Sequence, residues 1–220
     1  MLAPVSLSPT PRSTLTRLRE RARTDQADLY AVLDAGLIAH LGVVRDGSPV
    51  VIPTGFGRDG DTVYLHGSTG AGWMRMLDGA SVCLTVTHVD GLVYARSVFH
   101  HSINYRSAVV FGTARLIRDP QERVRGLRAV VEQLAPGSWE HARQPIAKEL
   151  AATAVAAIDL GEASVKVRMG GAVDDDADVA AGGRWAGVLP VRTAFGPPQP
   201  DPALEAGVPV PRHVRARVAA

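Results

Sequence analysis

The chain has 220 residues, of which 46% are hydrophobic and 21% are charged. These fractions are close to the averages of globular proteins, so they exclude a chain that is disordered as a whole and predict one domain with tails. The formal net charge is only +2, and only two of the 24 basic residues are lysines. Arg212, Arg215 and Arg217 lie near the C-terminus without aromatic residues between them, so we expect no nucleic-acid partner.

Cysteine content and hydropathy indicate the cellular compartment in which we expect the protein. Cys83 is the single cysteine, which excludes an intramolecular disulfide and a multi-cysteine zinc site. The first 23 residues contain no continuous apolar run, and no segment offers the ~20 apolar residues that a membrane-spanning helix needs. We therefore expect a cytoplasmic protein with no membrane partner.

The chain is predicted to change from an arm to a folded domain near residue 25. Residues 1–24 mix prolines, hydroxyl residues and arginines, and we expect them to form a flexible N-terminal arm. A short helix is predicted over 25–35, because Leu29, Val32 and Leu33 share one face and a glycine follows. The folded part then begins with this helix.

Short apolar runs between turn residues predict a series of antiparallel strands. Asp-Gly pairs at 46–47 and 59–60 favour tight hairpins, because both residues tolerate positive φ. Asp90-Gly91 is expected to form a further turn. The predicted strands are 37–44, 49–56, 62–66, 81–88, 92–96 and 108–117, and a Gly-rich segment (67–72) with a short helix (73–77) interrupts them.

The next part of the domain is predicted to contain two helices and a final pair of strands. Asp119-Pro120 is a strong helix start, since aspartate caps a helix and proline suits its first turn. The first helix is expected to bury Val124, Leu127, Val131 and Leu134. The second helix is expected over 145–151 and the strands over 152–160 and 164–169.

Beyond Met169 the composition shifts to glycine, proline, alanine and aspartate, so residues 170–220 are predicted to be a tail. Trp185 is the exception, because burial of its ring stabilises by roughly 1.5 to 3 kcal/mol or more. We expect residues 184–190 to dock and to bury this ring. The domain itself, residues 25–169, is then mainly β: a closed or nearly closed antiparallel barrel with peripheral helices.

Four patches of this sequence carry a resemblance to a known family. They are 39–44 (AHLGVV), 49–54 (PVVIPT), 64–68 (YLHGS) and 101–107 (HSINYRS). In this order and at these spacings they resemble the flavin-binding split-barrel group of pyridoxamine 5′-phosphate oxidase-like proteins, especially the branch that contains nitroimidazole-resistance proteins. The resemblance implies a split β-barrel of the FMN-binding type and a homodimer with FMN bound at the subunit interface.

Residues 64–72 are the candidate phosphate site. A strand that ends in a glycine-rich loop before a helix can present successive backbone N–H groups, here at Gly67 and with the hydroxyls of Ser68 and Thr69. Arg75 can add a positive charge. The alternative is an ordinary Gly-Ser-rich turn without a ligand.

His66 is the candidate catalytic residue. A neutral imidazole has one donor and one acceptor, so at the end of a strand it can hydrogen-bond a flavin edge, a substrate or a small acid. In the resembled branch the histidine of this motif lies at the active site; the alternative is that His66 only satisfies a loop carbonyl. His100 and His101 lack a third ligand at a recognisable spacing, which argues against a metal site there, whereas haem remains open because some split-barrel relatives bind it.

Two further segments complete the candidate cofactor site. The resemblance implies that one of them, made of Ile52, Pro53 and Thr54, faces the isoalloxazine. The other, made of Asn104, Tyr105 and Arg106, precedes a predicted strand and offers an amide, an aromatic plane and a cation to a flavin. The alternative places Tyr105 in the core and pairs Arg106 with an acid.

The sequence and the resemblance together predict an FMN-dependent oxidoreductase that reduces small nitro-aromatic or nitrogen-heterocycle substrates. No Ser-His-Asp order, Walker loop or Rossmann fingerprint is present, so the chemistry would belong to the cofactor. Relatives carry an Arg-Lys pair where this chain has Ala71 and Gly72, which predicts weaker flavin binding or a different anion. This departure supports a second interpretation, a non-catalytic flavin- or haem-binding protein for storage, sensing or sequestration.

Overall fold

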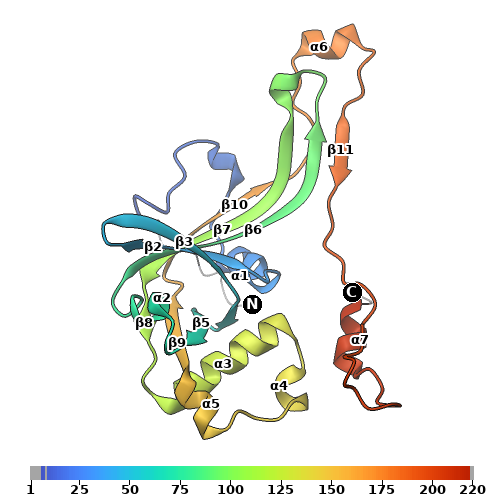
Figure 1. Cartoon of the computed structure of the whole chain (residues 1–220). Helices are drawn as coiled ribbons and strands as arrows, with labels where there is room; N and C mark the ends of the chain where they lie inside the picture. Colours follow the sequence, from blue (N-terminus) through green and yellow to red (C-terminus); the bar gives the residue numbers. More distant parts are fainter. Residues whose placement is uncertain (1–5, 8, 219–220) are drawn as a thin grey trace.

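Two antiparallel sheets form the body of the computed structural model, which describes residues 6, 7 and 9–218 (Figure 1). The seven-stranded sheet has the order β1-β10-β7-β6-β2-β3, and β11 pairs with β6 off this path. Its strands are β1 (Ala22–Arg23), β2 (Ala39–Arg45), β3 (Ser48–Thr54), β6 (Ser81–Tyr94), β7 (Ser102–Thr113), β10 (Glu162–Arg168) and β11 (Gly187–Pro190). The four-stranded sheet, β4-β5-β9-β8, consists of β4 (Phe56–Asp59), β5 (Thr62–Ser68), β9 (Thr153–Asp159) and β8 (Arg115–Leu116).

The helices lie around the sheets. They are η1 (Arg19–Arg21), α1 (Gln26–Asp34), α2 (Gly72–Arg75), η2 (Val98–His100), α3 (Pro120–Leu134), α4 (Ser138–His141), α5 (Ala147–Ala152), α6 (Asp176–Ala181) and α7 (Arg212–Val218). The predicted face of α1 is confirmed, because Leu29, Val32 and Leu33 are all buried. Among the described residues, no helix is both long and apolar enough to cross a membrane.

Strand alternation builds the main core between the two sheets. Val82, Leu84 and Val86 of β6 point inward, as their period of two predicts, and are at most 4% exposed. Val63 and Leu65 of β5 meet them from the smaller sheet in the same cluster. The alternate residues of β5, Tyr64 and His66, therefore lie on the opposite face of that sheet.

Helix α3 covers the outer face of the smaller sheet with a different side from the predicted one. Asp119 caps it as expected, accepting a hydrogen bond from the Glu122 amide at 2.7 Å. Its most buried residues, however, are Gly126, Ala129 and Val130. Of the four residues predicted to be buried, Leu127 packs half-buried against the same cluster, Val124 and Val131 are half-buried, and Leu134 is exposed. A Cβ on Gly57 of β4 would lie 2.2 Å from the backbone of Ala129. The helix thus presents its small residues to the sheet because its backbone approaches β4 so closely.

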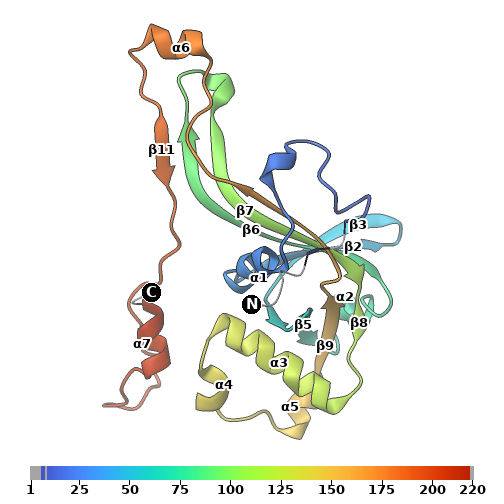
Figure 2. The same ribbon diagram turned by 180° about the vertical axis from the view of Figure 1, so that it is seen from behind.

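The expected turn at Asp90-Gly91 is wrong. Strand β6 continues from Ser81 to Tyr94, and the register against β7 shifts between Val89 and Gly91, as at a β-bulge. The chain reverses only after residue 94, near η2, so β7 begins at Ser102 instead of 108. Strands β6 and β7 form a long hairpin that projects from the body with β11 beside it, as Figure 1 and the reverse view in Figure 2 show.

The predicted docking of residues 184–190 is confirmed for the backbone, but the predicted burial of Trp185 is wrong. Residues 187–190 form β11, which pairs with β6 from Gly91 to Tyr94. Trp185 is nevertheless 69% exposed, and its ring lies 5.8 Å from that of Tyr94. Backbone pairing holds this part of the tail on the hairpin, and the indole contributes a tilted ring contact on an open face.

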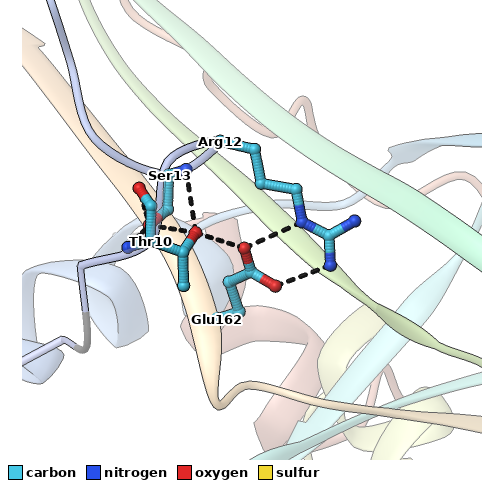
Figure 3. Close-up of polar contacts among 4 residues, drawn as sticks. All are labelled: Thr10, Arg12, Ser13 and Glu162. Atoms are coloured by element: carbon cyan, nitrogen blue, oxygen red, sulfur yellow. Dashed lines mark hydrogen bonds and ion pairs between the residues drawn. The ribbon is translucent and has the colours of Figure 1, made fainter.

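The N-terminal segment packs on β10 instead of forming a free arm over its described residues. β1 pairs with β10, and Leu7 donates a backbone hydrogen bond to Thr24 at 2.7 Å. Figure 3 shows Thr10 and Arg12 converging on the carboxylate of Glu162, with Arg12 Nη2 at 2.6 Å. Residues 1–5 and 8, which belong to the predicted arm, lie outside the described residues.

This attachment should weaken in acid. Hydrogen bonds from Arg12 and Thr10 lower the pKa of Glu162 from 4.5 to about 2. Because the folded-state pKa is the lower one, the contact stabilises fully above about pH 4.5 and is lost as the pH falls toward 2. Glu162→Gln should flatten the dependence of melting temperature on pH in this window, with Glu205→Gln as an exposed control. An unchanged dependence would contradict the assignment.

Candidate functional site

His66 lies near the end of β5, where it pairs with Val155 of β9. Its side chain lines a cavity of about 270 Å³ whose walls include Leu127, Trp139 and Pro145; we call it the His66 cavity. Protein atoms around the ring displace water and lower the pKa of His66, although the residue as a whole is exposed. This shift favours the neutral imidazole, which keeps a nitrogen lone pair for a ligand.

The Gly-rich loop uses most of its own amides. Thr69 N donates to Ala152 O at 2.9 Å, Gly70 N donates to Ser68 Oγ at 3.1 Å, and Ala71 N donates to Ser68 O at 2.9 Å. The loop therefore does not present the continuous row of N–H groups that the sequence suggested. Arg75 is exposed at the end of α2, within reach of solvent.

The loop glycines act partly through packing. A Cβ on Gly67 would lie 2.8 Å from Met74 Cγ, so this glycine lets α2 lie directly on β5. Gly72 has open space around it. Close packing against α2 thus explains why residue 67 of the predicted phosphate loop is a glycine.

Residues 52–54 lie on β3, at the edge of the larger sheet. Ile52 packs against the main core, whereas Pro53 is exposed on the outer face of the sheet and pairs with His40. Thr54 Oγ1 donates to Gly55 O at 3.1 Å. The side chains of this segment therefore face in two directions, and Pro53 is the one turned outward.

Asn104, Tyr105 and Arg106 lie inside β7 instead of preceding it. Arg106 forms a two-point ion pair with Asp90, at 2.8 and 2.9 Å, which is the acid-paired alternative. Asn104 is 7% exposed and bonds to Arg168 and to Gly170 O. Tyr105 lies on the other face of the strand. These residues belong to the larger sheet, so the structure does not join them with His66 of the smaller one.

A larger cavity, about 820 Å³, was missed by the sequence analysis. It lies between the base of the β6–β7 hairpin, α1, the end of α3 and the C-terminal segment; we call it the C-terminal cavity. Its lining includes His40, His88, Arg192, Phe195 and Arg217. These residues come from separate parts of the chain, so no local motif connects them. The available signal was Arg192, which lies two residues after the docking segment.

Metal ligation by side chains alone has no support in the described part of the chain, where no group of three His, Cys, Asp or Glu could hold an ion. His100 Nε2 lies 3.4 Å from Asp175, and His101 Nδ1 accepts from the Ala95 amide at 2.9 Å. The adjacent histidines therefore serve separate local contacts at the tip of the hairpin.

The two antiparallel sheets, the peripheral helices and the cavities between them define a split β-barrel of the flavin-binding type, as predicted. Residues 25–167 match the family model described as pyridoxamine 5′-phosphate oxidase, and the chain belongs to this family. No curated protein matches the chain.

Two solved structures are similar to nearly the whole chain. The flavocytochrome Anf3 of Azotobacter vinelandii is 43% identical, with a TM-score of 0.89, over 96% of this chain and 98% of its own. The FAD and heme binding protein of Mycobacterium smegmatis is 42% identical, with a TM-score of 0.86, over 90% of this chain and 97% of its own. The similarity thus extends well beyond the residues that the family model matches.

A third structure is similar in fold alone. A protein of Bacteroides thetaiotaomicron assigned to 5-nitroimidazole antibiotic resistance is 19% identical, with a TM-score of 0.53, over 66% of this chain and 86% of its own. It supports the split-barrel fold. The tail beyond the barrel is instead shared with the two flavin- and haem-related structures.

Proposed function

We propose that this protein binds a flavin and a haem and acts as an electron-transferring oxidoreductase. The observation that carries this proposal is the whole-length similarity, at 43% and 42% identity, to proteins described as a flavocytochrome and as an FAD and heme binding protein. FAD therefore takes the place of the FMN that the motif resemblance implied. Reduction of nitro-aromatic or nitrogen-heterocycle substrates stays a prediction from the motif around His66.

In the His66 cavity, the imidazole of His66 could hold part of a haem or of a flavin. Leu127, Val131 and Trp139 provide an apolar wall, and His66 provides a neutral imidazole whose pKa shift comes from desolvation alone. Apolar walls with few polar groups are typical of cofactor sites. His66 would hold such a ligand, and the wall would exclude water from it.

A bound flavin or haem would supply the electron chemistry, which the side chains of this family need not perform. The chain's own part is to bind, to orient and to exclude water. The small number of acid-base groups around His66 agrees with this division. It agrees equally with the second interpretation, a protein that stores or senses its ligand without turnover.

The absorption spectrum of the purified protein, with chromatography of the extracted cofactors, tests the proposal. We expect a Soret band together with the paired bands of oxidised flavin, and FAD in the extract. Flavin bands without a Soret band, even after reconstitution with hemin, would contradict the proposal that the protein binds haem. A colourless protein that binds neither added cofactor would overturn the proposal. Reduction of the bound flavin by a nicotinamide donor, followed by reoxidation, would separate an enzyme from a storage protein.

We further propose that the protein is a homodimer formed through the outer face of the larger sheet. Exposed apolar side chains follow one face of the projecting hairpin and β11. They are Val89, Leu92, Tyr94, Ile103 and Leu189. Contiguous exposed apolar patches mark interaction sites, and a twofold partner can cover such a face with its own copy.

Light scattering should give the mass of a dimer. Ile103→Glu should shift the mass toward a monomer, because it places a charge within the apolar face, where Ile103 is 46% exposed. Leu204→Glu is the matched control, since Leu204 is 47% exposed but lies in the C-terminal segment away from this face. A wild-type monomer that still binds flavin stoichiometrically would contradict the dimer.

A further inference from the structure

We propose that the C-terminal cavity binds the adenosine diphosphate group of a dinucleotide, with Arg192 and Arg217 as its phosphate ligands. The assignment of this group to FAD rests on the proposed function. The volume, about 820 Å³, lies within the range of roughly 300–1,000 Å³ that is typical of ligand pockets. The cavity is thus large enough for a nucleotide.

The carboxylates in the cavity wall already have hydrogen-bond or ion-pair partners within the chain. Asp34 accepts from Arg58 at 2.6 and 2.7 Å, and Asp90 accepts from Arg106 at 2.8 and 2.9 Å. Glu132 accepts two backbone N–H groups at 2.7 and 2.9 Å. Arg58 and Arg106 thus offset the charges of Asp34 and Asp90, whereas Glu132 is held by backbone hydrogen bonds and keeps its negative charge.

The two remaining arginines of the wall have no such partners. The ion pairs of the described residues include neither Arg192 nor Arg217. Arg217 lies over the ring of Phe195, with its guanidinium carbon 4.4 Å from the ring centre. Stacking leaves the edge of a guanidinium open, and this edge matches phosphate oxygens with paired N–H groups. The cavity thus carries two arginines that form no ion pair among the described residues, and a diphosphate could bind between them.

The rest of the lining suits a nucleoside. Ile38, Val89 and Val191 supply apolar surface, and Phe195 supplies an aromatic ring. Gln133 donates through Nε2 to the carbonyls of Leu33, Asp34 and Gly36 at 2.7–3.0 Å, which fixes its side-chain amide. The amide oxygen is then held in place as an acceptor for an amino group such as that of adenine.

The fold brings the arginines to the cavity from both ends of one segment. Arg192 lies two residues after the end of β11, which is held by its pairing with β6. Arg217 lies on α7, where His213 contacts Ser138 at 3.4 Å and stacks near His141 at 5.0 Å between ring centres. Figures 1 and 2 show this segment running back from the hairpin beside the body. Its two anchored ends fix both cations against α1 and α3.

Titration calorimetry of the full-length protein, freed of bound nucleotide, with ADP, FAD, FMN and NADH tests this inference. We expect ADP to bind, and Arg192→Ala and Arg217→Ala each to weaken ADP and FAD binding by about tenfold or more, since each removes charge-assisted hydrogen bonds. FMN affinity should not change. Arg184→Ala is the control, an exposed arginine of the same tail outside the cavity lining.

The outcomes separate this inference from the proposed function. If the two alanine variants lost affinity for NADH and not for FAD, the nucleotide site would stand but would belong to a nicotinamide donor. If the protein bound no flavin but bound ADP in an arginine-dependent way, the proposed function would fail and the site would stand. If ADP did not bind, or bound both variants as tightly as wild type, the site would be wrong. Arg192→Lys, which keeps the charge and leaves α7 untouched, should retain part of the ADP affinity.

Discussion

Gly57→Ala should destabilise the protein by about 3 kcal/mol or more, the upper part of the range for an overpacked core. The added Cβ would lie 2.2 Å from Ala129 C and O and 2.4 Å from Val130 N. These are backbone atoms in the middle of α3, so no side-chain rotation can relieve the clash. The helix as a whole would have to move away from β4.

Thermal unfolding measures this effect. For a chain of this size, 3 kcal/mol corresponds to a fall in melting temperature of roughly 6–12 °C. Gly161→Ala is the control, because Gly161 lies directly before β10 but has open space around its Cβ position and an ordinary φ. Equal melting temperatures for the two variants would show that α3 does not pack on β4 in this way.

His66→Ala should weaken cofactor or substrate binding by about tenfold or more, while the melting temperature changes little. The exposed imidazole buries little area, so its loss leaves the core intact. Loss of one or two hydrogen bonds, at about 0.5–1.5 kcal/mol each, accounts for a change of this size, and loss of a haem ligand would exceed it. The measurement pairs the melting temperature with the dissociation constants of flavin and haem.

Val82→Ala provides the opposite pattern. Val82 is 4% exposed in the main core, so its truncation should lower the melting temperature and reduce binding only through loss of folded protein. If His66→Ala instead melted many degrees lower and its folded fraction bound both cofactors normally, His66 would be structural. The cofactor site would then have to be sought at the C-terminal cavity.

Features that depend on neighbouring residues could be predicted from the sequence. The Asp46-Gly47 hairpin forms with φ of 50° and 76° at its two residues, because an Asp-Gly pair tolerates this backbone wherever it occurs. The cap of α3 forms at Asp119 because its side chain reaches an amide only three residues away. The motif around His66 likewise indicated the family, since its residues are adjacent in the chain.

Features that depend on distant segments were decided by the tertiary structure. Asp90-Gly91 has the composition of a turn, but pairing with β7 and β11 on both sides and the Asp90–Arg106 ion pair hold it inside β6. The buried side of α3 is set by its approach to Gly57, which the helix sequence does not contain. The C-terminal cavity joins α1, α3, the hairpin and the tail, so its arginines meet only after the chain has folded.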